Sequence, residues 1–167
     1  LVDQDGYFSG YASIFAQPDQ GGDIVMKGAF LSSLAARGAS GIRMLFQHDP
    51  KQPVGRIVNI NEDANGLLVK GQLLLEVPKV HSLGQLISGG ALNGLSIGFR
   101  TVRASKDRQS GYRRLWQIDL WEVSIVTFLM MERARIYPTA KPPDPLVRPA
   151  QSPQQTIAAA ISLIRNH

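Results

Sequence analysis

Short runs of apolar and β-branched residues recur along the first 128 residues, and turn-forming residues separate them. Runs of this kind, about four to eight residues long and bounded by Gly, Pro, Asn or Asp, predict β-strands. Asn65-Gly66 adds a strong hairpin signal, because both residues tolerate the positive φ of a two-residue turn. The pattern predicts seven strands, at residues 6–15, 42–47, 54–60, 67–75, 95–102, 112–120 and 122–128.

Two further segments have the helical period instead. The apolar side chains of residues 28–37 share one predicted helix face: Phe30, Leu31, Leu34 and Ala35. Those of residues 78–88 do the same: Val80, Leu83 and Ile87. Because hairpins outnumber βαβ units, the sequence predicts an α+β fold, with a mainly antiparallel, β-barrel-like core of about seven strands and a few short helices.

The chain changes character after Ile136. Prolines recur from Pro138 to Pro153, and such a density excludes both helix and central strand. We therefore predict three parts: a core over residues 1–136, a proline-rich linker over residues 137–155, and a short C-terminal helix or tail over residues 156–167.

The composition fits a soluble globular domain, with 44% hydrophobic and 19% charged residues. No apolar stretch is long enough to span a bilayer, and residues 1–5 lack the basic and then apolar pattern of a signal peptide. We therefore expect neither a membrane span nor a signal peptide. The initial Leu1 leads us to expect a trimmed form. The chain has no cysteine and three dispersed histidines, which gives no thiolate nucleophile and no zinc-type ligand spacing. We expect no metal and no cofactor, since the glycine pairs also lack a phosphate-loop pattern.

The net charge of +5 raises the possibility of a nucleic-acid partner. The densest basic runs lie at residues 100–114 and 133–135, and the first of them contains only Tyr112 as an aromatic residue. A stacking platform for single-stranded nucleic acid needs several exposed rings. A solvated basic hairpin therefore explains this charge better than nucleic-acid binding does.

Two residues have surroundings that suggest chemistry. His48 follows the apolar run 42–47 and precedes Asp49-Pro50, which places it at a strand end with a partly exposed imidazole. Ser96 lies between Gly94 and Gly98, and small neighbours let a substrate and an oxyanion approach its hydroxyl. A histidine base and a serine nucleophile are two thirds of a serine hydrolase site. Each residue alone also has an ordinary structural interpretation, as a turn histidine and a strand serine.

The third member of such a site must accept a hydrogen bond from the histidine. Glu122 is a carboxylate inside an otherwise apolar strand, and a buried carboxylate requires a partner. That partner is either His48 or an arginine, the candidates being Arg100, Arg114 and Arg133. Other carboxylates compete for the role of orienting the histidine: Asp23, Asp49 and Asp119.

Five runs, in this order along the chain, resemble the prohead maturation proteases of tailed bacteriophages, whose fold is similar to that of the herpesvirus capsid-assembly protease. They are residues 10–15, residues 23–30, Phe46-Gln47-His48-Asp49 with Pro53-Val54-Gly55, Asn93-Gly94-Leu95-Ser96-Ile97-Gly98-Phe99, and residues 119–127. Together they extend over roughly residues 6–136. The resemblance implies a herpesvirus-protease-like fold and a serine endopeptidase.

The resemblance also implies residue roles. His48 and Ser96 match the catalytic histidine and the nucleophile of the family, and Glu122 matches its acidic position. The backbone amides near Ser96, at Ile97 and Gly98, and the side chain of Arg133 are the candidates for oxyanion stabilisation.

For partners, the resemblance implies the major capsid protein, cut in its scaffolding segment inside the assembling prohead in the host cytoplasm, with self-cleavage as well. A homo-oligomer, dimer or higher, is expected by analogy with the herpesvirus enzymes. The alternative function is a basic β-rich module that binds nucleic acid or capsid as a scaffold without turnover.

Overall fold

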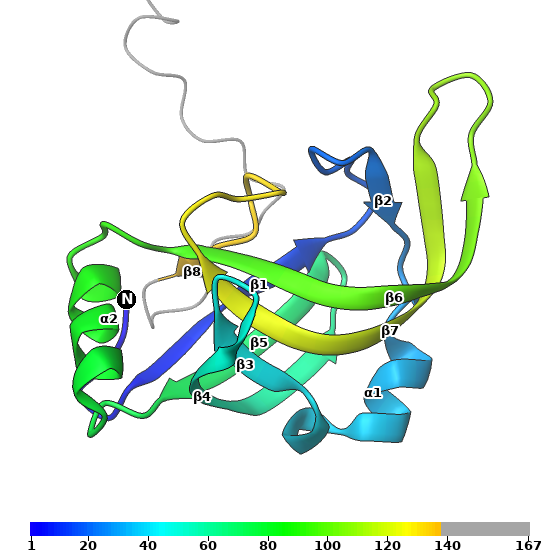
Figure 1. The fold of residues 1–167 in the computed structure, drawn as a ribbon. Helices are drawn as coiled ribbons and strands as arrows, with labels where there is room; N and C mark the ends of the chain where they lie inside the picture. Colours follow the sequence, from blue (N-terminus) through cyan, green and yellow to red (C-terminus); the bar gives the residue numbers. More distant parts are fainter. Residues whose placement is uncertain (138–167) are drawn as a thin grey trace, which may run out of the picture.

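The structure is a computed structural model that describes residues 1–137 (Figure 1). Within these residues the elements, in chain order, are β1 (Tyr7–Ile14), β2 (Asp23–Val25), α1 (Leu31–Arg37), a 3₁₀ turn (Ala39–Gly41), β3 (Arg43–Phe46), β4 (Asp49–Glu62), β5 (Gly66–Leu73), α2 (Pro78–Ser88), β6 (Gly94–Lys106), β7 (Arg113–Val126) and β8 (Ile136–Tyr137). The predicted linker lies outside the described residues except for Tyr137, which belongs to β8, and the predicted tail lies outside them entirely.

The strands form one strongly curved sheet in the order β2-β7-β3-β4-β5-β1-β8, and β6 pairs with β7 (Figure 1). Most pairs are antiparallel, as predicted, and two are parallel, because β2 and β3 both run alongside β7 in its own direction. The predicted hairpin between β4 and β5 is confirmed, but neither Asn65 nor Gly66 has a positive φ. Asp63 holds the turn instead, because its carboxylate accepts the amides of both residues. The fold is thus a curled half-barrel, in which the long strand β7 touches three other strands.

The two strands predicted at 112–120 and 122–128 are a single strand, β7. The prediction was wrong because the alternation of buried positions slips along this strand. Its most deeply buried apolar positions are not evenly spaced: Leu115, Ile118, Leu120, Val123 and Ile125. One slip falls at Trp121, which has no partner on β6 and forms a bulge between the pairs Gly98–Glu122 and Phe99–Leu120. Neither β2 nor β8 was predicted, since two or three residues carry no readable period.

Both predicted helices are present, but the buried face of α1 differs from the prediction. Leu31 is 58% exposed, whereas Ser33 is buried and its hydroxyl accepts a hydrogen bond of 2.8 Å from the Leu120 amide. The Glu62 carboxylate accepts bonds from the amides of Gly28 and Phe30 at the start of this helix. In α2 the predicted face is confirmed, since Val80, Leu83 and Ile87 are buried.

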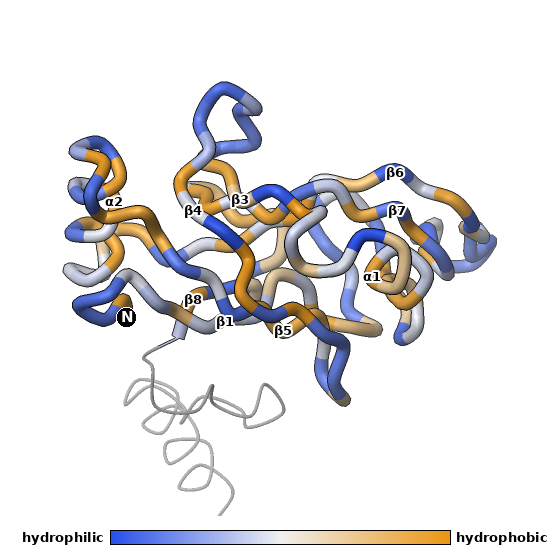
Figure 2. The backbone as a smooth tube through the Cα atoms, turned by 90° about the horizontal axis from the view of Figure 1, so that it is seen from below, coloured by the Kyte–Doolittle hydropathy of each residue, from blue (hydrophilic) through white to orange (hydrophobic). Residues whose placement is uncertain are grey.

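Hydrophobic stretches follow the strands and α2, and hydrophilic stretches lie mainly in the turns and at the tip of the β6–β7 hairpin (Figure 2). The core side chains come from every strand from β1 to β8 and from α2. The start of β6, the end of β7 and the β3–β4 turn therefore meet on a rigid, well-packed support. This region contains the chemically interesting residues.

Candidate active site

His48 lies in the two-residue turn that joins β3 to β4. Phe46 and Asp49 are paired, so Gln47 and His48 form the loop between them, and both have positive φ, 55° and 59°. Tight hairpins require such angles and usually take them from Asn or Gly. Here β7 holds the turn instead, because the Ile125 carbonyl accepts the Gln47 amide and the Ser124 hydroxyl accepts the His48 amide. The turn that carries the imidazole therefore has a fixed position at the ends of strands β3 and β4.

Glu122 contacts His48 directly. The Nδ1–H of His48 donates to Oε1 of Glu122 at 2.5 Å, and Glu122 is only 9% exposed. The question of its partner is thus resolved in favour of the histidine rather than an arginine, because no described arginine lies within ion-pair distance of this carboxylate.

The pKa of His48 is raised above its usual 6.5. The main cause is the hydrogen bond to the Glu122 carboxylate, which the charge of that carboxylate reinforces, and partial burial opposes the shift. An imidazolium at this position is therefore stabilised, which is the form that the histidine takes after it has accepted a proton.

Ser124 is a third member of this polar group that the sequence reasoning did not assign. Its hydroxyl donates to Oε2 of Glu122 at 2.7 Å and accepts the His48 amide at 3.0 Å, and the residue is fully buried. It thus fixes the carboxylate and the histidine backbone at once. The signal was available, because positions 122 and 124 lie on the same face of a strand.

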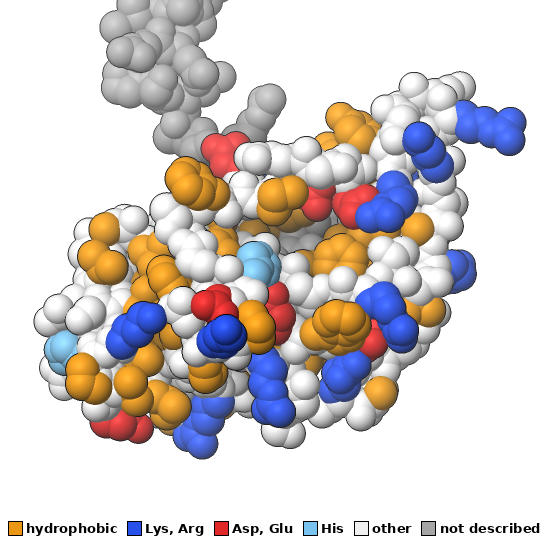
Figure 3. Space-filling view, viewed as in Figure 1, with side chains coloured by type: hydrophobic (Ala, Val, Ile, Leu, Met, Phe, Trp, Pro, Cys, Tyr) orange, Lys and Arg blue, Asp and Glu red, His pale blue; other side chains and the backbone are white. Residues whose placement is uncertain are grey.

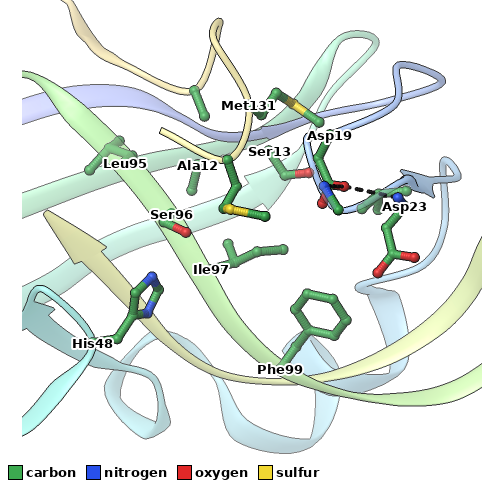
Figure 4. A pocket seen from close by; sticks show the side chains of 14 residues that line it. Ala12, Ser13, Asp19, Asp23, His48, Leu95, Ser96, Ile97, Phe99 and Met131 are labelled. Atoms are coloured by element: carbon green, nitrogen blue, oxygen red, sulfur yellow. Dashed lines mark hydrogen bonds between the residues drawn. The ribbon is translucent and has the colours of Figure 1, made fainter. Parts of the chain in front are cut away.

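Ser96 lies on β6 directly opposite Ser124 and is 8% exposed. Ser96 and His48 line the same cavity, of about 250 Å³, and Figure 4 shows both side chains at its edge. Figure 3 shows this face of the molecule, where a hollow lies beside the central histidine. The structure therefore brings together the three residues predicted as a catalytic set, Ser96, His48 and Glu122.

The predicted oxyanion residues have different positions. Ile97 lines the cavity, whereas Gly98 and Arg133 are not among its lining residues. Gly98 lies opposite Glu122, and a Cβ atom there would come within 2.1 Å of Oε1 of that carboxylate. Its small size thus makes room for the acid. Arg133 lies before β8, and its carbonyl accepts the Tyr137 hydroxyl.

The competing carboxylates have other partners. Asp23 forms a two-pronged ion pair with Arg113, Asp119 pairs with Arg37, and Asp49 accepts bonds within its own turn from Lys51 and Gln52. Among residues 1–137 no cluster of three or more potential metal-binding side chains occurs. In the same range, no helix combines the length and the apolar character that crossing a membrane would need.

Comparison with solved structures defines the fold. The chain is similar to the capsid assembly protease of bacteriophage T4, with a TM-score of 0.59 and 15% identity over 72% of this chain and 80% of that chain. It is also similar to the varicella-zoster virus protease, with a TM-score of 0.51 and 14% identity over 96% of this chain and 76% of that chain. The expected herpesvirus-protease-like fold is therefore confirmed.

Sequence comparison gives the family. Residues 2–144 match the family described as Caudovirus prohead serine protease, and the chain belongs to that family. It is 34% identical to the prohead protease of Enterobacteria phage HK97 over 135 residues, which cover 80% of this chain and 60% of that protein. It is 28% identical to the prohead protease of Escherichia phage T5 over 119 residues, 71% of this chain and 55% of that protein. The matched region thus spans less than two thirds of either relative.

Proposed function

We propose that this chain is the protease part of a phage capsid maturation enzyme and that it cleaves peptide bonds with Ser96 as nucleophile. The observation that carries the proposal is the line of contacts from buried Glu122 to His48, at 2.5 Å, with both His48 and Ser96 on one cavity. A nucleophile, a base and a group that orients the base are the parts that serine acyl transfer needs. Family membership supports the same reading.

In the proposed mechanism the Ser96 hydroxyl attacks the carbonyl carbon of the substrate peptide bond, while Nε2 of His48 accepts its proton. Glu122 holds the Nδ1–H of the ring and stabilises the imidazolium that forms. The imidazolium then returns the proton to the leaving amine, and an acyl-enzyme remains on Ser96. Water, activated by the neutral His48, hydrolyses that ester and restores the serine.

The backbone amide of Ile97 is well placed to stabilise the oxyanion. The Leu95 amide donates to the Ala134 carbonyl, on the edge of β6 that faces away from β7. Amides two residues apart on a strand point to the same edge, so the Ile97 amide also faces away from β7, next to the nucleophile. A fixed amide at such a position stabilises a developing negative charge. We therefore assign this role to Ile97 rather than to Gly98 or Arg133.

Family membership also supports a proposal for the substrate and the partner. We propose that the chain cuts the scaffolding segment of the major capsid protein, and also itself, within the assembling prohead in the host cell. Assembly of the chain into a homo-oligomer belongs to the same proposal. Co-assembly with the capsid protein, followed by mass mapping of the cleaved ends, tests both substrates, and a capsid protein that stays uncut would contradict this part.

Labelling with a fluorophosphonate tests the chemistry itself. We expect one adduct, on Ser96, located by peptide mass spectrometry. It should be absent in Ser96→Ala and reduced at least about 100-fold in His48→Ala, because the hydroxyl then loses its base. Ser110→Ala, which removes an exposed hydroxyl from the hairpin tip, is the matched control and should label normally. An adduct elsewhere, or none before and after co-assembly with the capsid protein, would contradict the proposal and favour a binding module without turnover.

A further inference from the structure

The cavity beside Ser96 extends away from His48 toward the loop that precedes β2 (Figure 4). Its walls are largely apolar, with the side chains of Val25, Leu95, Ile97, Phe99, Met130 and Met131. At the end far from His48 the lining changes, and polar groups appear there: Ser13, Asp19 and Asp23. A cavity with apolar walls and one polar end, next to the proposed nucleophile, has the shape and polarity to hold one long side chain.

The two carboxylates at the polar end differ in their charge balance. Both carboxylate oxygens of Asp23 accept hydrogen bonds from the Arg113 guanidinium, at 2.7 and 2.6 Å, so this ion pair neutralises the Asp23 charge. Asp19 accepts only backbone amides, those of Gly21 at 2.8 Å and Asp23 at 2.9 Å, both on Oδ1. Within residues 1–137 it forms no ion pair. Arg113 lies close enough to Asp19 for that carboxylate to help raise its pKa, but its two hydrogen bonds go to Asp23. One cation thus faces two carboxylates, which leaves a net negative charge and the second oxygen of Asp19 at this end of the cavity.

Ser13 adds an independent observation that points to a ligand. It is 3% exposed, and its hydroxyl is the one buried side-chain polar atom of the described chain without a hydrogen-bond partner. Figure 4 shows this hydroxyl directed toward the Asp19 end of the cavity. A buried hydroxyl without a partner is unfavourable, so a position of this kind indicates a group that binds there when the site is used.

We propose that this cavity is a specificity subsite for a lysine or arginine side chain of the peptide substrate. The apolar walls would cover the aliphatic stem, and the cationic head would donate to Oδ2 of Asp19 and to the Ser13 hydroxyl. An acidic head would meet the Asp19 charge, and an apolar one would leave two polar groups unpaired. This inference rests on the proposed function, because it takes Ser96 as the atom that the substrate must reach.

Binding of a lysine side-chain mimic tests the subsite without any need for turnover. The probe is n-butylammonium, with 1-butanol as its uncharged counterpart, added at constant ionic strength to the ¹⁵N-labelled protein. We expect saturable shifts of the amide signals of Ser13, Asp19 and Ile97 with butylammonium and none with butanol. Equal shifts with both probes, or none at either, would overturn the subsite whatever the enzyme does.

Variants then assign the recognition to its residues. Asp19→Asn keeps the Oδ1 acceptor for the two turn amides but removes the charge, so we expect at least about a five-fold loss of butylammonium affinity with little change in stability. Asp5→Asn removes an exposed carboxylate elsewhere and should bind as wild type. Ser13→Ala should weaken binding about two-fold or more while the free protein stays as stable or gains stability, because no hydrogen bond is lost. Unchanged affinity in Asp19→Asn would overturn the proposal.

A peptide library connects the subsite to cleavage. In the active protein we expect one substrate position to prefer Lys or Arg over norleucine by about ten-fold or more, and Asp19→Asn to remove that preference. Normal labelling with no basic preference would reject the subsite and leave the proposed function intact. Absent labelling together with saturable butylammonium binding would reject the proposed enzyme but keep the cation site.

Discussion

The β6–β7 hairpin has two halves that share one hydrogen-bond ladder but differ in how deeply their side chains are buried. The inner half, residues 94–98 with 122–126, is buried, and its polar groups bond to one another and to His48. The outer half, residues 103–106 with 113–117, leads to the projecting hairpin tip (Figure 1). Apart from buried Leu115 its side chains are partly or fully exposed, and its polar contacts, such as Trp116 with Ser105, lie at the surface. Burial turns ordinary polar side chains into a set in which each depends on the others.

The largest combined effect, on stability and labelling together, should come from filling the space opposite Glu122. In Gly98→Ala the new Cβ would lie 2.1 Å from Oε1 of that carboxylate, so the acid must move away from His48. We expect a loss of stability of about 1–3 kcal/mol and labelling of Ser96 slowed at least about 100-fold. Ser105→Thr adds one carbon to the outer half and should change neither. A Gly98→Ala protein that labels at the normal rate would show that the carboxylate position is unimportant.

Glu122→Gln should be next in size. The variant keeps the shape of the side chain but loses the charge that stabilises the imidazolium, so we expect labelling to fall about 10²- to 10⁴-fold. The pH dependence of labelling should show the same effect. His48 acts as base only when neutral, and its pKa is raised, so the acid limb of the wild-type rate lies above pH 6.5. In the variant this limb should move to lower pH, as measured by labelling rates between about pH 5 and 9.

The same pKa shift predicts how stability depends on pH. A histidine whose folded-state pKa is raised above 6.5 favours the folded protein fully below that pH, and the contribution disappears as pH rises through the folded-state value. Denaturant unfolding of wild type across this window should show the decrease, and Glu122→Gln should flatten it. An identical slope in both proteins would mean that the ion pair does not form in solution.

Ser124→Ala should have an intermediate effect. It removes the donor to Glu122 and the acceptor for the His48 amide, so we expect about 1–3 kcal/mol of lost stability and roughly ten-fold slower labelling. Ser33→Ala is a close control, because that buried hydroxyl also bonds to β7, at the Leu120 amide, but far from the nucleophile. It should cost comparable stability and leave labelling unchanged. If both variants slow labelling equally, Ser124 acts through general stability rather than by positioning His48.

The smallest effect is expected in the outer half. Arg114 pairs with Asp107 at 3.1 Å on the surface, and the pKa of Asp107 is lowered to about 2, mainly by the Ser110 amide and then by Arg114. Exposed pairs of this kind contribute little, so Arg114→Gln should change Tm by less than about 3 °C and labelling not at all. What Asp107 contributes is present above its usual 3.8 and is lost as pH falls through about 2.

How far the sequence could predict this molecule depends on the range of the interactions concerned. The hairpin near Asn65-Gly66 and the buried face of α2 depend on local patterns, and both were predicted correctly, although the turn itself lacks the expected positive φ. The continuity of β7 was missed, because a bulge at Trp121 shifts the alternation of buried residues. For the site, residue types indicated His48, Ser96 and Glu122, but only the fold could show that Glu122 bonds to His48 while Asp23 and Asp119 pair with arginines.

The strand period could place Ser124 on the same face as Glu122, but its contact with His48, like the cavity beyond Ser96, could come only from the fold. The hydroxyl of Ser124 matters because the β3–β4 turn lies against it, which depends on the parallel pairing of β3 with β7. Asp19 and Ser13 line one cavity from separate segments of the chain, and neither belongs to a sequence motif that would have predicted this cavity.

The contact between the β3–β4 turn and β7 also has a consequence for the order of events during translation. His48 and Glu122 are 74 positions apart in the chain, and the turn that carries the histidine takes its hydrogen bonds from residues near the end of β7. At synthesis rates of about 5–20 residues per second, the base is made about 4–15 s before the acid that orients it. A ribosome-bound chain that ends before β7 therefore cannot form the contact between His48 and Glu122. Under the proposed function, such a chain could not yet cleave peptide bonds, its own included.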